Sequence, residues 1–200
     1  MEEKKQDQLT ALYEVIFTES LNGYSLQPKL GKSREYKFRN AVVDEKICKP
    51  CWDKYGTVFP NKKAPTTMEI RLNSHHFCRC FIEPMLCILS GTATVYGNGG
   101  ADYSVKLTGS LPDNYIKKEE AKEKGWKEWV GNLHDVLPGA SIYTTYQNRK
   151  KKLPESQDRV WYEADINYHS GHRNSQRLLF SDDGLIFVTY DHYQTFFQIV

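Results

Sequence analysis

The end of the chain limits the possible folds most, because residues 159–200 read as short strands joined by tight turns. In "RVWYEADINY" (159–168) successive side chains alternate between two faces, as they do along a β-strand. One face carries Val160, Tyr162, Ala164, Ile166 and Tyr168, and the other carries Trp161, Glu163, Asp165 and Asn167. The run "SQRLLFSDDGLIFVTYD" reads as two strands joined at "SDDG", since Asp-Gly is a strong hairpin signal. With a last strand in "DHYQTFFQIV", these residues predict an antiparallel sheet.

Helices are predicted upstream of these strands. In "LPDNYIKKEEAKEKGW" a short helix is expected from about Lys118 to Lys124, with acidic residues in its first turn and Gly125 as its terminator. The segment "LTALYEVIFTESL" near the N-terminus also has roughly helical apolar spacing. Helices followed by an antiparallel sheet place the chain in the α+β class.

Cysteine usage divides the chain into two parts. All five cysteines precede residue 90, and the run "LSGTATVYGNGGADYS" near the junction is rich in Gly, Ser and Thr, as linkers and exposed turns are. We therefore predict two domains, 1–95 and 96–200. Cys87 stands apart from the other four cysteines and is interpreted as a core thiol.

Net charge and hydropathy do not by themselves indicate a binding partner of this protein. Net charge is +2, from 27 basic and 25 acidic side chains. The short basic run "RKKKLPE" reads as a solvated loop. No apolar run reaches the length of about 18 residues that a membrane span requires. The N-terminus "MEEKKQDQLT" does not have the pattern of a secretory signal. If the protein is exported to the medium or delivered to a target cell's cytoplasm, another route than a cleavable signal peptide is expected.

The N-terminal part contains the donor set of a metal site. "CKPCW" holds Cys48 and Cys51, and "HHFCRC" holds His75, Cys78 and Cys80 about 25 residues later. Thiolates and an imidazole at such spacing suit tetrahedral zinc, so a structural zinc ion is expected within residues 40–90. A reduced buried cysteine pair and disulfides are the two alternatives.

Polar groups of the C-terminal strands suggest catalysis on a phosphate. Glu163 and Asp165 share one strand face, Arg173 and Arg177 follow in the next turn and strand, and His192 lies in the last turn. Metal-free RNA cleavage needs a carboxylate to remove the 2′-hydroxyl proton, an imidazolium to protonate the leaving 5′-oxygen, and cations on the phosphate. A strand Glu paired at the surface and a solvated turn His are the plainer interpretation of the same residues.

From about Gly99 to Val200 the chain resembles barnase-type bacterial ribonucleases, which are extracellular and prefer guanine. The matching runs are "LPDNYI", "GW", "GNL", "DVLPG", "NR", "LP", "EADINY", "SGHRNSQR" and "DHYQTF". The resemblance implies the microbial ribonuclease fold, with N-terminal helices packed on a curved antiparallel sheet. It also implies endonucleolytic cleavage of single-stranded RNA by 2′-hydroxyl transesterification through a 2′,3′-cyclic phosphate, without a metal cofactor. A monomeric nuclease domain with no membrane contact is expected.

The resemblance assigns roles to individual residues. Glu163 corresponds to the general base and His192 to the general acid. Asp165 corresponds to the carboxylate that braces the arginines. The other residues around the scissile phosphate are Lys118, Arg173, Arg177 and Tyr193. His169 and His172 match no catalytic position and are interpreted as surface histidines.

Base recognition is where the chain departs from that family. Asn148 and Arg149 correspond to the start of the loop that binds guanine, but Lys150 stands where the family has a glutamate that accepts hydrogen bonds from the base. A lysine only donates, so guanine preference is open. The preceding loop "IYTTYQNR" is one residue shorter than in the family and lacks its Gly-Gly-Asp. Lys117 also replaces the hydroxyl residue that caps the following helix, a loss of about 1 kcal/mol.

The region around residues 40–85 resembles the C-terminal part of phage Mu-type minor head (head-morphogenesis) proteins. The matching runs are "VDEKICKPCWDKYGTVFP" and "HHFCRCFIEPM", with His76 where that family usually has proline. This likeness implies that residues 1–95 are a fragment of a phage-derived delivery module with a small zinc-finger-like region. Because the metal ligands and the nuclease residues are different residues, metal removal is expected to leave the nuclease active.

Two functions follow. In the first, the chain is a toxin-type endoribonuclease, and a cell that makes it also makes an acidic, barstar-like immunity protein that covers the cationic site. In the second, it is a phage head-associated structural protein whose nuclease-like domain is inactive or only binds RNA. The presence of Glu163, His192, Arg173 and Arg177 together favours the first.

Overall fold

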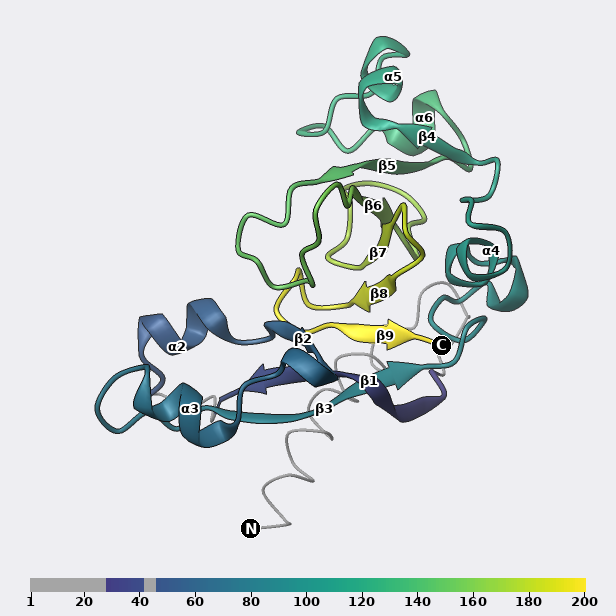
Figure 1. Ribbon diagram of the computed structural model, residues 1–200. Helices are drawn as coiled ribbons and strands as arrows, with labels where there is room; N and C mark the ends of the chain where they lie inside the picture. The colour runs from purple at the N-terminus through teal and green to yellow at the C-terminus, as the bar shows by residue number, and fades with distance from the viewer. Residues whose placement is uncertain (1–27, 42–45) are drawn as a thin grey trace.

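A computed structural model describes residues 28–41 and 46–200. Its strands form one nine-stranded sheet in the order β2-β1-β3-β9-β8-β7-β6-β5-β4 (Figure 1). The strands are β1 (Leu30–Asn40), β2 (Val58–Pro60), β3 (Phe81–Ile88), β4 (Tyr115–Lys117), β5 (Ser141–Tyr146), β6 (Trp161–Asp165), β7 (Arg177–Ser181), β8 (Ile186–Thr189) and β9 (Phe197–Ile199). Few helices accompany this sheet, and the α+β class predicted from sequence is confirmed.

Short helices lie at both ends of the sheet and beside its middle (Figure 1). They are α2 (Lys49–Lys54), α3 (Thr67–Leu72), α4 (Ala101–Thr108), α5 (Lys118–Glu123) and α6 (Leu133–Val136), with 3-10 turns η1 (Asn61–Lys63) and η2 (Gly97–Gly99). The helix predicted from about Lys118 to Lys124 is α5, and the chain turns at Gly125 with φ +99°. The helical pattern predicted near the N-terminus lies outside the described residues.

Hydrogen bonding in the sheet follows the predicted pattern in its middle and departs from it at two places. Strands β5 to β9 pair antiparallel in sequence order, and β7 and β8 form the hairpin predicted at "SDDG", with Gly184 at φ +91°. However, β4 pairs parallel with β5, and β3 pairs parallel with β9. The sheet is therefore mixed. The antiparallel pairing predicted for the C-terminal strands is confirmed from β5 to β9, and the antiparallel sheet that the resemblance implies is wrong only at β4. Strands of three residues, such as β4 and β9, carry too little pattern to reveal the direction of their neighbours.

The pairing of β3 with β9 joins the N-terminal strands to the C-terminal ones. Cys87 lies opposite Gln198 and Ile88 opposite Ile199 in this ladder. Ser33 and Glu35 of β1 also bond to the Gln198 side chain, through its oxygen and its nitrogen respectively. The sheet is thus continuous across residue 95, where the sequence predicts a domain boundary, and that boundary stays a prediction. Residues 90–100 form turns, as their composition indicated.

The largest core lies between α4 and the strands. Ala101 and Val105 of α4 pack with residues of β3 and β6 to β9. The strand residues of this cluster are Ile88, Ala164, Leu178, Phe180, Ile186, Val188, Phe197 and Ile199. A second core on the other face holds Trp161, Leu179 and Phe187, so β6 to β8 are covered on both faces. Among the described residues, no helix combines the length and the apolar character needed to cross a bilayer.

Candidate active site

A buried carboxylate organises the centre of the candidate site. Asp165, at the end of β6, is 0% exposed. It accepts hydrogen bonds from Nε and Nη2 of Arg173, each at 2.7 Å, in a two-pronged contact. Its Oδ1 also lies 3.0 Å from Nε of buried Arg177, an ion pair that lacks hydrogen-bond alignment. One negative charge therefore holds two guanidinium groups, so these three side chains together keep an excess of one positive charge.

Glu163 lies two residues earlier on the same strand and points toward this cluster. The hydroxyl of Tyr193 donates a hydrogen bond to its Oε2 at 2.7 Å, and Nη2 of Arg173 lies 4.0 Å from its Oε1. Burial and the adjacent Glu163 carboxylate raise the pKa of Tyr193, so its phenol stays protonated and can donate. The alternation of "RVWYEADINY" thus places both carboxylates on one face, but Asp165 is buried there rather than solvated.

His192 lies in the turn between β8 and β9, beside the same tyrosine. The residues at this turn, His192 and Tyr193, have φ of +55° and +67°. Their rings lie 5.0 Å apart, and the His192 amide donates to Ser175 O at 3.3 Å. The side chain of Asp191 closes the turn by accepting from the amides of Gln194 and Thr195 at 3.0 and 2.9 Å. His192 is exposed and can reach a bound ligand.

Lys118 joins the cluster from α5 through an acid that the sequence analysis did not single out. Glu128 accepts from Lys118 Nζ at 2.9 Å through Oε2, and its Oε1 lies 3.2 Å from Arg173 Nη1. Hydrogen bonding from Lys118, reinforced by Arg173, lowers the pKa of Glu128. The glutamate follows Trp126 in an irregular loop, so no periodic pattern could have indicated its direction.

The loop after β5 is braced from inside. The Asn148 side chain is buried, donates to Leu153 O at 2.9 Å and accepts from Leu153 N at 3.1 Å. Arg149 and Lys150 are exposed on the loop. Lys152, by contrast, is 2% exposed and its Nζ donates to Tyr193 O at 2.9 Å. The solvated loop expected for "RKKKLPE" is therefore wrong at this residue, because a tertiary partner draws its ammonium inward.

Two further expectations concern residues at the edge of the site. Lys117 precedes α5 with extended backbone and provides no side-chain cap, as its residue type implies. His169 and His172 are both exposed, in agreement with their interpretation as surface histidines. The structure thus brings Glu163, Asp165, Arg173, Lys118 and Tyr193 into one bonded network and places His192 next to it.

Comparison with known proteins assigns the C-terminal half of the chain to a family. A family model described as ribonuclease matches residues 99–200. The chain belongs to the ribonuclease family. It is 50% identical over 103 residues to the ribonucleases of Heyndrickxia coagulans, Bacillus intermedius and Bacillus pumilus. The match spans 51% of this chain, 94% of the Heyndrickxia coagulans protein and 63% of each of the other two.

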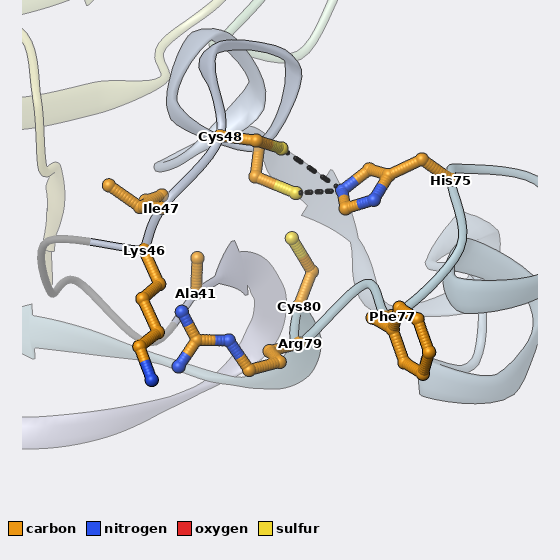
Figure 2. A pocket seen from close by; sticks show the side chains of 9 residues that line it. Ala41, Lys46, Ile47, Cys48, His75, Phe77, Arg79 and Cys80 are labelled. Atoms are coloured by element: carbon orange, nitrogen blue, oxygen red, sulfur yellow. Dashed lines mark hydrogen bonds between the residues drawn. The ribbon is translucent and has the colours of Figure 1, made fainter.

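The ribonuclease match begins just before α4, so the cysteines lie outside it. All five are free thiols, and four of them gather with His75 between α2, α3 and β3. Nε2 of His75 lies 3.0 Å from Cys48 Sγ and 2.9 Å from Cys51 Sγ, in a cavity of about 30 Å³ (Figure 2). Cys51 also groups with Cys78 and Cys80, all within 4.8 Å of one another. Cys87 is buried in β3, as expected for a core thiol.

Two details show that this donor set fits a zinc ion. Nδ1 of His75 lies 2.8 Å from His76 O, and a carbonyl only accepts. Nδ1 therefore carries a proton, so Nε2, which faces the two thiols, is the nitrogen available to a metal, as in metal-ligating histidines. In addition, Arg39 is 6% exposed, and its Nη2 lies 3.3 Å from Cys80 Sγ. A zinc ion with three thiolates and one neutral histidine carries one net negative charge, which this arginine would offset.

Proposed function

We propose that this endoribonuclease cleaves single-stranded RNA without a metal ion, by transesterification through a 2′,3′-cyclic phosphate. The observation that carries the proposal is the bonded network in which Tyr193 holds Glu163 and Asp165 holds both arginines. This network supports the proposal because it gathers a carboxylate and fixed cations, with the His192 ring 5.0 Å from the Tyr193 ring, and these are the groups that the reaction needs.

In the proposed first step Glu163 accepts the proton of the 2′-hydroxyl while that oxygen attacks phosphorus. The bond from phosphorus to the 5′-oxygen breaks, and His192 in its imidazolium form gives its proton to the leaving oxygen. The Tyr193 hydroxyl at 2.7 Å fixes the orientation of the carboxylate without neutralising it. In the second step water replaces the 5′-hydroxyl, and the two residues exchange roles as the cyclic phosphate opens.

The guanidinium groups and Lys118 stabilise charge on the phosphorane. Arg173 is fixed by two hydrogen bonds to Asp165, so it meets the phosphate without losing much conformational freedom. Arg177 is buried behind it, and its Nη1 is held by Gln176 O at 2.7 Å. A preorganised positive cluster is worth more in such a partly buried site than in water.

The test is cleavage of short RNA oligonucleotides, each containing one base type, in buffer with EDTA. Cyclic-phosphate products are expected by mass spectrometry, and DNA of the same sequence should resist because it has no 2′-hydroxyl. Inactive protein, or activity that depends on added metal, would contradict the proposal. The same assay measures base preference, and we propose that guanine preference is weakened, because exposed Lys150 can only donate.

We propose further that the enzyme is a toxin, neutralised in its producer by an acidic immunity protein. Lys118 and Arg173 belong to the network around Glu163, and His192 lies next to it, so an inhibitor covering the site needs complementary negative charge. Association with such a protein should slow as salt screens the patch, and Arg173→Ala should weaken binding. Equal binding by the Arg173→Ala protein would show that neutralisation occurs elsewhere on the surface.

For the N-terminal part we propose a structural zinc ion held by Cys48, Cys51 and His75, with Cys78 or Cys80 as fourth ligand. The His75 tautomer and the buried Arg39 support this choice. The ion would tie α2 to the segment that precedes β3 and would take no part in the chemical step. The likeness to phage minor head proteins rests on the same cysteines and stays a prediction.

A further inference from the structure

The turn that follows α2 lies against residues 191–195, the turn that carries His192 and that we call the catalytic turn. Gly56 has φ +76°, and a Cβ placed on it would lie 2.0 Å from Gln194 O and 3.8 Å from Thr195 Cα. No side chain fits between the two backbones, so they meet directly. Gln194 is two residues after His192, and both belong to the turn 191–195 that Asp191 closes. The N-terminal part of the chain thus contacts the segment that presents the proposed acid.

This catalytic turn needs support because its backbone is strained. His192 and Tyr193 are consecutive non-glycine residues with positive φ, each costing on the order of 1 kcal/mol or more. Such a conformation persists only where its surroundings determine it. The Asp191 carboxylate accepts hydrogen bonds from the amides of the turn, and Gly56 lies against the Gln194 carbonyl of the same turn.

A second connection runs through the loop after β5. Val58 of β2 donates its amide hydrogen to Lys152 O at 2.6 Å, and Lys152 Nζ donates to Tyr193 O at 2.9 Å. Val58 also belongs to one apolar cluster with Leu153 and Phe196. Strand β2 therefore fixes the backbone of Lys152. The side chain of Lys152 fixes Tyr193, and the Tyr193 hydroxyl in turn binds Glu163.

We propose that residues 56–58 are a positioning element for the catalytic turn 191–195, so that the N-terminal part of the chain contributes to catalysis. This rests on the proposed function of His192 and Tyr193. Both supporting contacts come from residues that precede the family match at 99–200, so they are additions to the ribonuclease part. Loosening them should lower kcat with little change in KM, because the phosphate cations stay in place.

The cysteine and histidine cluster is connected to the same element. Gly56 N donates to Arg39 O at 2.9 Å, Arg39 N donates to Thr57 O at 2.9 Å, and the Arg39 side chain contacts Cys80 Sγ. The expectation that the metal site and the nuclease are independent relied only on their having no residue in common. These contacts link the two, so disordering the cluster should reduce kcat as well.

The chain offers a matched pair of glycines for the test. Gly56 and Gly109 have φ of +76° and +75°, but nothing lies within 4 Å of a Cβ at Gly109. Alanine therefore suffers the same backbone strain at both positions and meets Gln194 O only at position 56. Gly56→Ala is expected to lose at least tenfold in kcat and to shift the His192 imidazole resonances in NMR spectra. Gly109→Ala should keep wild-type kcat and resonances. Equal kcat in the two folded variants would overturn the proposal.

If Gly56→Ala fails to fold, a second pair decides. Lys152→Met removes the hydrogen bond to Tyr193 O, whereas Lys151→Met changes an exposed neighbour. A kcat loss confined to Lys152→Met supports the positioning role, and equal kcat in both overturns it. Failure of the proposed function is distinguishable, because the wild-type protein would then show no metal-independent cleavage in the same assay.

Discussion

Glu128 Oε1 lies 3.2 Å from Nη1 of Arg173, the guanidinium that Asp165 holds through its other two nitrogens. The second oxygen of the same carboxylate accepts from Lys118 at 2.9 Å. Glu128 thus binds two of the cations that are proposed to bind the scissile phosphate, and an RNA phosphate has to compete with it. The side chain is 46% exposed, so solvent screens both contacts and the competition is weak.

Replacing Glu128 by glutamine should therefore improve substrate binding. Glu128→Gln keeps the shape of the side chain but removes its charge, so KM for a dinucleotide should fall several-fold while kcat changes little. Isothermal titration with inorganic phosphate checks the same effect without turnover. Glu120→Gln is the control, because the salt bridge of Glu120 is to exposed Lys124 rather than to a cation of the site. A KM that is unchanged or higher in Glu128→Gln would contradict the competition.

Removing either proposed proton-transfer group should nearly abolish cleavage. Glu163→Gln and His192→Ala are each expected to lower kcat by about 100-fold to 10,000-fold, the usual contribution of general acid–base catalysis. His172→Ala, an exposed histidine in the neighbouring turn, is expected to match the wild-type rate. Steady-state cleavage of a fluorogenic RNA measures all three. Wild-type kcat in His192→Ala would remove His192 from the role of general acid.

Much of the C-terminal half could be predicted from sequence because its signals are local. The alternation around Glu163 and the Asp-Gly turn before Gly184 each specify their own conformation, and β6 to β8 form as expected. The parallel pairing of β3 with β9 could not be predicted, since it joins segments more than one hundred residues apart. No short-range pattern encodes such a contact.

The residues that were missed are those whose role depends on a tertiary partner. Glu128 lies in an irregular loop, and Lys152 lies in a basic run whose composition indicates solvent exposure. In the sequence Gly56 cannot be told from any other turn glycine, because its contact with Gln194 O is seen only in the structure. The Cys and His spacing, by contrast, did predict that the five side chains would gather, because ligand spacing is a property of the sequence itself.

Asp165 should be the carboxylate whose loss costs most stability. It is fully buried between Arg173 and Arg177, so Asp165→Asn removes the buried counter-charge that the two guanidinium groups share. Arg173 would keep the more exposed Glu128 and the more distant Glu163. The free energy of unfolding should fall by about 3–5 kcal/mol, as when one partner of a buried ion pair is removed. Urea unfolding followed by tryptophan fluorescence measures the loss, with exposed Asp135→Asn as the control. A loss as small as that of the control would show that water compensates the arginines.

Lys152 should make stability depend on pH in the alkaline range. Burial, together with nearby Lys150, lowers the pKa of Lys152 from 10.5 to about 8. Folding therefore favours the neutral amine, so the free energy of unfolding should rise between about pH 8 and pH 10.5, by at most about 3 kcal/mol. Below pH 8 this contribution is absent. Lys152→Met has no such group, so the difference between wild type and variant should grow over that window. A difference that stays constant from pH 7 to pH 10.5 would show that Lys152 stays charged in the folded state.

Metal analysis tests the cysteine and histidine cluster. Protein purified under reducing conditions without chelator should contain about one zinc ion per chain, because Cys48, Cys51 and His75 already converge. Cys51→Ser should lose the ion, since Cys51 belongs to both donor groups, and Cys87→Ser should keep it, since Cys87 lies apart in β3. Comparing Cys78→Ser with Cys80→Ser identifies the fourth ligand, because only the ligand's replacement should weaken zinc binding markedly.

Removing the ion should also lower kcat, through the contacts that lead from Arg39 to Gly56. Absence of zinc from all preparations would instead support a cluster of reduced, hydrogen-bonded thiols.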